Sequence, residues 1–192
     1  MSHDQIVKKG KEVIRIEAEA IANLSSRVNE HFAKAVELMY ACKGRVVVTG
    51  MGKSGIIARK IVATLNSTGT PSLFLHASDA VHGDLGMVRK EDVVLCISKS
   101  GDTAELNNLL PIFKRIGVPI ISMVGSVQSK LSKVSDIVLD VSVKEEACPH
   151  DLAPTASTSA ALAFGDALAI ALLEKRNFTA EDFALYHPGG NL

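Results

Sequence analysis

Two glycine-rich segments of the chain carry residue types that could bind a phosphate group. The first is VVVTGMGKSG at residues 46–55, where three valines precede three glycines in G-x-G-x-x-G spacing, with Lys53 and Ser54 between the last two. This spacing fits the fingerprint of a dinucleotide site, whereas the four residues that a P-loop needs between its glycines are missing. The segment therefore predicts an anion-binding turn and, taken alone, permits NAD.

The second segment is CISKSGDTAEL at residues 96–106. Ser98, Ser100 and Thr103 supply hydroxyl groups, a glycine permits a tight turn, and a predicted helix begins directly afterwards. Free backbone N–H groups and the helix dipole favour an anion at such a helix start. Serine and threonine also cap helices without any ligand, and this alternative stays open for one loop alone. Two such loops at one edge of a sheet favour a phosphate site.

A dinucleotide is disfavoured by a second test. Its site needs an acidic residue at the end of the next strand, about 20 residues past the glycines. This chain has FLHASD there, with His76 in the expected place and Asp79 close by. NAD therefore remains only a weak alternative.

The elements that must position these loops follow from the apolar pattern. Helical spacing predicts helices at residues 4–25 and 29–42, after which strands and helices alternate. We predict strands at RVVVTG, PSLFLH, DVVLCIS, PIISMVG and DIVLDV, and helices at SGIIARKIVATLNSTG, TAELNNLLPIFKRIG and STSAALAFGDALAIALLEKR. The strands are apolar on both faces, as in a parallel sheet that helices cover on both sides. The sequence thus predicts an α/β three-layer sandwich of Rossmann-like or flavodoxin-like type, with right-handed crossovers.

Composition narrows the class of protein. The chain has 192 residues, of which 47% are hydrophobic, with 21 Lys+Arg against 21 Asp+Glu. We expect a single domain over residues 1–192, with a helical extension at about residues 1–43. Zero net charge and the absence of tryptophan argue against a nucleic-acid partner. Three cysteines without C-x-x-C spacing, a polar start and no apolar run of about 18 residues favour a cytoplasmic protein without a membrane partner.

Seven motifs in order resemble a known family. GMGKSG, STGTPSLFLH, HGDLGM, SKSGDTAE, EACPHDLAPTAST, GDALAIAL and FALYHPGG together resemble the sugar isomerase (SIS) domain of the D-arabinose-5-phosphate isomerases. The resemblance implies a five-stranded parallel sheet, a homotetramer and no required cofactor. It also implies interconversion of D-ribulose 5-phosphate and D-arabinose 5-phosphate, the first committed step toward the lipopolysaccharide sugar Kdo.

The resemblance also implies roles for individual residues. Four positions match catalytic positions of the family: Lys53, Glu105, Glu146 and His187. Seven positions match substrate contacts, and the three serines and the last threonine among them match contacts to the phosphate: Ser54, Gly69, Thr70, His82, Ser98, Ser100 and Thr103. His76 matches a position linked to an inhibitory zinc ion. Glu105 also stands where a capping-box glutamate would stand relative to Asp102, so a purely structural role is equally open.

The chemistry of an aldose–ketose isomerase suggests a division of labour. A base must move a proton between C1 and C2 through a cis-enediol, and a partly buried carboxylate gains basicity because burial raises its pKa. Our hypothesis takes Glu146 as the base and Glu105 as the next candidate. His187 assists ring opening or proton transfer to oxygen, and Lys53 offsets charge on the enediolate. The alternatives are a sugar-phosphate-sensing regulatory module and an isomerase of another sugar phosphate.

Most members of this family continue past the HPGG motif into a pair of CBS domains, whereas this chain stops at Leu192. We expect a natural short form or a truncated chain, which puts CBS-mediated control in doubt. Direct feedback at the pocket by Kdo or its nucleotide-activated form is a further expectation. The apolar surface of the N-terminal helices and of residues 157–175 predicts an oligomer interface, and with it an active site shared between subunits.

Overall fold

Five parallel strands form the centre of the molecule. The computed structural model describes residues 1–189, and its strands lie in the order β2-β1-β3-β4-β5. Their bounds are β1 Val46–Gly50, β2 Ser72–His76, β3 Val93–Ser98, β4 Ile120–Val124 and β5 Ile137–Asp140. Every neighbouring pair is parallel, and β1 and β3 are buried along their whole length. The predicted α/β sandwich with a five-stranded parallel sheet is confirmed.

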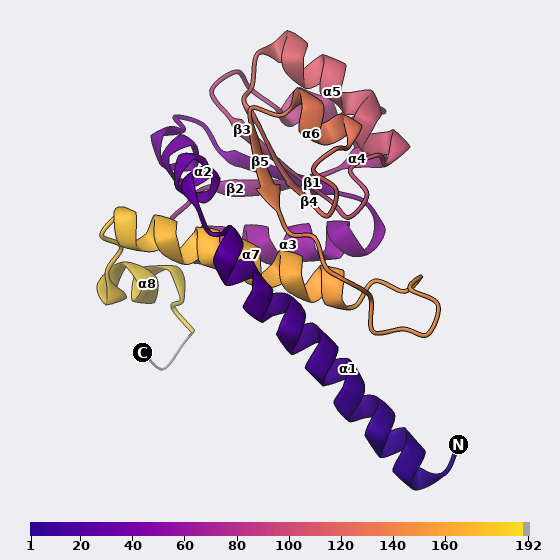
Figure 1. Cartoon of the computed structure of the whole chain (residues 1–192). Coiled ribbons are helices and arrows are strands. Elements are labelled where there is room, and N and C mark those ends of the chain that lie inside the picture. Colours follow the sequence, from indigo (N-terminus) through magenta and orange to yellow (C-terminus); the bar gives the residue numbers. More distant parts are fainter. Residues whose placement is uncertain (190–192) are drawn as a thin grey trace.

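Helices cover both faces of this sheet (Figure 1). One face carries α2 (Glu30–Ala41), α3 (Gly52–Ser67) and α7 (Ala156–Lys175), together with the end of α1 (His3–Asn23). The other face carries α4 (Ala77–Ala80), α5 (Ala104–Ile116) and α6 (Lys130–Val134). Helix α8 (Ala180–Tyr186) lies outside α7, and two 3₁₀ turns span Leu24–Arg27 and Asp84–Met87. Since helices follow strands in a parallel sheet, α3 and α5 begin at its carboxyl edge.

Helix α1 has two different halves. Its first half projects from the body as an arm, with Ile6, Val7 and Ile14 exposed (Figure 1). Its second half packs on α7 and on the chain just before α7, where Ile16 and Ala20 contact Ala147 and Ala156. The end of α1 therefore holds the segment that leads into α7.

Helix α7 is apolar around its whole circumference. By length and composition it could cross a membrane, contrary to the expectation from sequence that no segment would qualify. Half of its apolar window is buried, and it packs closely on α3, where a Cβ on Gly165 would lie 2.3 Å from Ile61 Cδ1. In this fold α7 is a core helix.

Candidate functional site

The first glycine turn lies between β1 and α3 and leaves the start of α3 without a side-chain cap. Gly52 has φ +55°, which favours glycine, and a Cβ on Gly55 would lie 2.8 Å from the Gly50 carbonyl oxygen. The residue before the helix is Met51, whose side chain makes no capping hydrogen bond. The first N–H groups of α3 therefore face the sheet edge without a side-chain acceptor, as a bound anion requires.

The second loop runs from Ser98 to Thr103 and is braced by its own hydroxyls. The Ser98 hydroxyl accepts a hydrogen bond from the Gly101 N–H at 3.0 Å and lies 3.0 Å from Thr103 Oγ1. Thr103 is the residue before α5, yet its side chain makes no capping bond to the helix. The simple capping alternative is therefore wrong for this loop, and α5 begins with its own N–H groups available.

The capping-box alternative for Glu105 is also wrong. Thr103, not Asp102, is the N-cap residue of α5, and the Asp102 carboxylate instead accepts the N–H of Lys130 at 3.0 Å. Glu105 lies in the first turn of α5 and is exposed. Among residues 1–189 the structure shows no hydrogen bond or ion pair for its carboxylate, so this group is free to act on a ligand.

Glu146 occupies the start of α7. Its Oε2 accepts hydrogen bonds from the N–H of Thr155 at 2.8 Å and of Ser157 at 3.1 Å, and from the Thr155 hydroxyl at 3.2 Å. Lys99 Nζ lies 2.8 Å from its other oxygen, Oε1. The Glu146 carboxylate thus caps α7 from the preceding loop and neutralises the positive end of that helix dipole.

These contacts set the acidity of Glu146. Burial alone would raise the pKa of this carboxyl group, but the Lys99 ammonium and the donors on Ser157 and Thr155 outweigh it and lower the pKa to about 2. The expectation of a raised pKa for Glu146 is therefore wrong. Burial here comes with donors that all favour the charged form, which makes Glu146 a weak proton acceptor.

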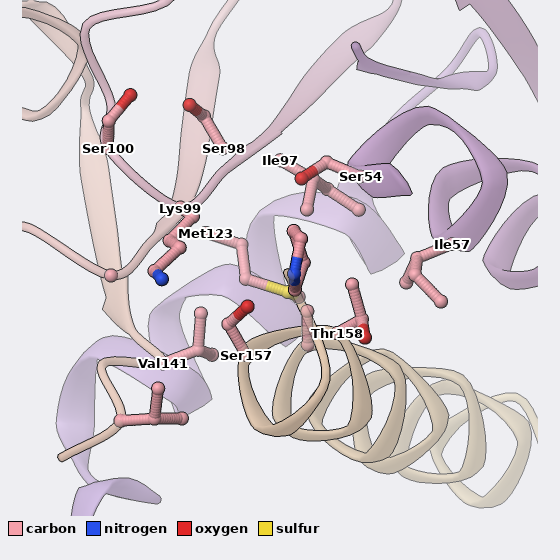
Figure 2. Close-up of a pocket in the computed structure, with 14 residues that line it drawn as sticks. Ser54, Ile57, Ile97, Ser98, Lys99, Ser100, Met123, Val141, Ser157 and Thr158 are labelled. Atoms are coloured by element: carbon pink, nitrogen blue, oxygen red, sulfur yellow. The ribbon is translucent and has the colours of Figure 1, made fainter. Parts of the chain in front are cut away.

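A pocket of about 220 Å³ lies between the carboxyl edge of the sheet and the start of α7 (Figure 2). Ser54, Ser98 and Ser100 line one side of it, and Ser157 and Thr158 of α7 line the other. Ile97, Met123 and Val141 form apolar walls. The pocket therefore joins the two anion-binding loops to the N-terminal end of α7.

Three of the expected site residues lie elsewhere in the protomer. Gly69 and Thr70 precede β2 and so lie at the amino edge of the sheet, where the Thr70 hydroxyl accepts a hydrogen bond from Arg176 Nε at 3.0 Å. His187 follows α8, stacks on Phe183 and contacts its carbonyl oxygen through Nδ1 at 2.7 Å. The structure does not bring these residues to the pocket of their own chain, because they lie at the far end of α7. The expectation that Gly69 and Thr70 bind substrate is therefore wrong for the pocket of their own chain.

The remaining expected residues lie at or near the carboxyl edge. Lys53 is exposed in the first turn of α3, beside Ser54. His76 ends β2, with Nδ1 3.6 Å from Asp79 Oδ2, and His82 is exposed in the following turn. Within residues 1–189 no three histidine, cysteine or acidic side chains form a group that could hold a metal. The inhibitory zinc at His76 stays a prediction.

The sequence motifs assigned no role to Lys99, Ser157 or Thr158, although all three line the pocket. Lys99 lies between Ser98 and Ser100 of the second loop. A lysine at the carboxyl end of a strand is a sequence signal that could have identified it as a site residue. Ser157 could not be found in this way, because its place depends on how the loop before α7 folds back onto the sheet.

Comparison with known proteins gives a consistent set of relatives. Residues 39–171 match the family model of the SIS domain. The chain is 56% identical over 186 residues to the arabinose 5-phosphate isomerase KdsD of Pseudomonas aeruginosa, covering 97% of this chain and 57% of that protein. The chain thus spans little more than half the length of the curated relatives it matches.

Two solved structures are similar over almost the whole chain. The Escherichia coli CFT073 protein c3406 in complex with arabinose 5-phosphate has a TM-score of 0.94 and 45% identity, covering 98% of this chain and 100% of that one. A sugar-phosphate isomerase-like protein from Listeria monocytogenes has a TM-score of 0.95 and 39% identity, with the same coverage.

Proposed function

Because this chain belongs to the SIS domain family, we propose that it interconverts D-ribulose 5-phosphate and D-arabinose 5-phosphate. One observation carries the proposal: two helices without side-chain caps, α3 and α5, begin beside hydroxyl groups at the same edge of the sheet, next to a pocket of about 220 Å³. Such helix starts suit a phosphate dianion. The relatives named as arabinose 5-phosphate isomerases, and the E. coli chain in complex with arabinose 5-phosphate, support this choice of sugar.

The reaction needs one base and donors for two oxygen atoms. The base takes a proton from C1 of ribulose 5-phosphate while the oxygen on C2 gains one, which gives the cis-enediol. A proton then returns to C2, the C1 hydroxyl loses its proton, and the aldose results. No hydride leaves the substrate, so the isomerisation requires no redox cofactor.

We assign the base to Glu105 rather than Glu146. Glu146 accepts hydrogen bonds from Thr155 and Ser157 and pairs with Lys99, and its pKa is lowered to about 2, so it holds a proton poorly at neutral pH. Glu105 is exposed at the start of α5, directly after the phosphate loop. Lys53 at the start of α3 offsets the charge of the phosphate and the enediolate, and His187 from a neighbouring subunit shuttles protons to oxygen.

Assembly, location and regulation complete the proposal. Oligomers, with the homotetramer as the proposed form, would bring His187 to a neighbour's pocket. The enzyme would be cytoplasmic, and its product would enter the synthesis of Kdo and lipopolysaccharide. Kdo or its nucleotide-activated form would compete with the substrate at the anion-binding loops. A zinc ion bound through His76 would inhibit the isomerisation. A calorimetric titration without heat for Kdo and its activated form would remove the feedback proposal.

The central test is incubation of the purified chain with ribulose 5-phosphate in deuterated water. We expect arabinose 5-phosphate with deuterium at C2, a loss of at least about 10²-fold in kcat for Glu105→Gln, and parent-like kcat for Glu91→Gln, an exposed carboxylate before β3. No product from any pentose phosphate, despite sugar-phosphate binding, would favour the sensing module. Full activity of Glu105→Gln would return the base to Glu146 or His187.

A further inference from the structure

Lys99 points away from the phosphate loop that contains it. In Figure 2 the hydroxyls of Ser98 and Ser100 point to one side of the loop, and the Lys99 ammonium points to the other, toward Val141 and Ser157. Its side chain crosses from the end of β3 to the start of α7, where Nζ lies 2.8 Å from Glu146 Oε1. The loop thus presents hydroxyls to a phosphate and a cation to the opposite part of the pocket.

The two partners of this ion pair differ in access. The Glu146 side chain is 0% exposed, whereas the Lys99 side chain is 43% exposed and lines the pocket. A ligand can therefore reach the ammonium but not the carboxylate. Since the carboxylate is fixed by the N–H groups of Thr155 and Ser157, it holds the ammonium at one place.

A second donor lies at the same end of the pocket. The Ser157 hydroxyl is buried. It lies near enough to the Glu146 carboxylate to favour the charged form of that carboxylate. Among residues 1–189, however, no group completes a hydrogen bond with the Ser157 hydroxyl. The neighbouring Thr158 hydroxyl is already donated to the Thr155 carbonyl oxygen at 2.8 Å. A buried hydroxyl without a completed hydrogen bond, in the wall of a pocket, is one that a ligand oxygen would satisfy.

We propose that Lys99 is a catalytic residue that donates, together with Ser157, to the substrate oxygens on C1 and C2, and that Glu146 is the positioning residue that aims it. This inference rests on the proposed isomerase function. Negative charge develops on those two oxygens in the enediolate, and preorganised donors stabilise it more than they stabilise the ground state.

The test uses Lys99→Met, Lys99→Arg and Ser157→Ala in the full chain, with Lys90→Met as the matched control. Lys90 is an exposed lysine before β3, at the opposite edge of the sheet. We expect Lys99→Met to lower kcat by about 10²-fold with KM within about threefold of the parent, and Ser157→Ala to lower kcat by at least about tenfold. Lys99→Arg should recover part of the loss, and Lys90→Met should match the parent. Calorimetry with inorganic phosphate should give the parent affinity for Lys99→Met.

The double variant Lys99→Met/Glu146→Gln separates a chemical role from a structural one. It replaces the ion pair by two neutral side chains, so it should regain thermal stability relative to either single variant without regaining activity. Recovery of activity in the double variant, or parent kcat in Lys99→Met, would overturn the inference while leaving the isomerase function in place. An inactive parent would overturn both.

Discussion

Glu146 lies in a motif that the family resemblance assigns to catalysis, yet the contacts of its carboxylate stabilise the fold. Its carboxylate accepts hydrogen bonds from the N–H groups of Thr155 and Ser157 and pairs with the Lys99 ammonium. Because these contacts lower the pKa of Glu146 to about 2, its contribution to stability should be visible in acid.

We expect Glu146→Gln to lower the free energy of unfolding by about 2 kcal/mol at neutral pH. The pKa of Glu146 falls from 4.5 to about 2 on folding, so its stabilisation is complete above pH 4.5 and disappears between pH 4.5 and 2. Urea unfolding at several pH values should show the gap between parent and variant closing over this window. Glu145→Gln, at an exposed neighbour, is the control, and a gap that does not change with pH would contradict the assignment.

The hydroxyl of Ser100 offers a second test at this scale. It accepts the Asp102 N–H at 3.2 Å, which leaves its own proton free for a phosphate oxygen. Ser100→Ala should raise KM several-fold with little change in kcat, and Thr103→Ala should raise KM further because it also removes the brace to Ser98. Steady-state kinetics against Ser25→Ala, an exposed serine on the 3₁₀ turn after α1, would check this. Unchanged KM in both loop variants would make these hydroxyls structural only.

The sequence predicted the positions of the two glycine turns well and the far end of the pocket poorly. Gly52 and Gly101 have positive φ values and lie in turns that local spacing marks out. The partners of Glu146 come 9–11 residues later in the chain, after an irregular segment in which its own N–H bonds to Asp151. The spacing of apolar residues does not encode such a turn. The lowered pKa of Glu146 and the direction of the Lys99 side chain could therefore be seen only in the structure.

At the scale of elements, the long helices and all five strands were predicted to within about two residues, because each has a clear apolar face or core. The short helices α4, α6 and α8 were missed, since segments of 4–7 residues are helical only through tertiary contacts. In α6, for example, a Ser129 cap and a buried Leu131 hold one turn against the phosphate loop.

Gly101 is where this short helix meets the phosphate loop, and it should tolerate no side chain. Its φ is +69°, and a Cβ would lie 2.0 Å from Ser129 Oγ. We expect Gly101→Ala to destabilise the chain by about 3 kcal/mol or more, because strain adds to overpacking. Gly117→Ala shares a positive φ of +83° but meets nothing within 4 Å, so it should cost only about 1 kcal/mol. Thermal unfolding compares the two, and equal losses would show that backbone strain alone matters.

At the scale of the whole molecule, one protomer leaves apolar surface uncovered. Ile170 on the outer face of α7 is exposed, as are Ile14 and Ile21 on α1, although an apolar helix of this kind is normally buried all round. His187 lies at the end of α7 away from the pocket. Both facts favour an oligomer in which one subunit completes the site of another.

We therefore expect Lys53→Ala and His187→Ala each to be nearly inactive, and their co-expression to restore part of the activity. Mixed oligomers would contain some interfaces that pair an intact Lys53 with an intact His187. Differently tagged subunits, purified through both tags, would supply the mixed species for assay. Mixed oligomers that form but stay inactive would assign His187 to its own subunit.

The apolar character of α7 also matters to the chain during its synthesis. All five strands precede α7, so the sheet face that it covers, with Ile61 and Leu65 of α3, stays open to water until the last of its 20 residues has left the ribosome. Over that interval the nascent chain carries an uncovered core and then an apolar helix long enough for a bilayer. Both features expose a nascent chain to aggregation. A variant that loosens α7 should thus be lost by aggregation or membrane capture before it is lost as an enzyme.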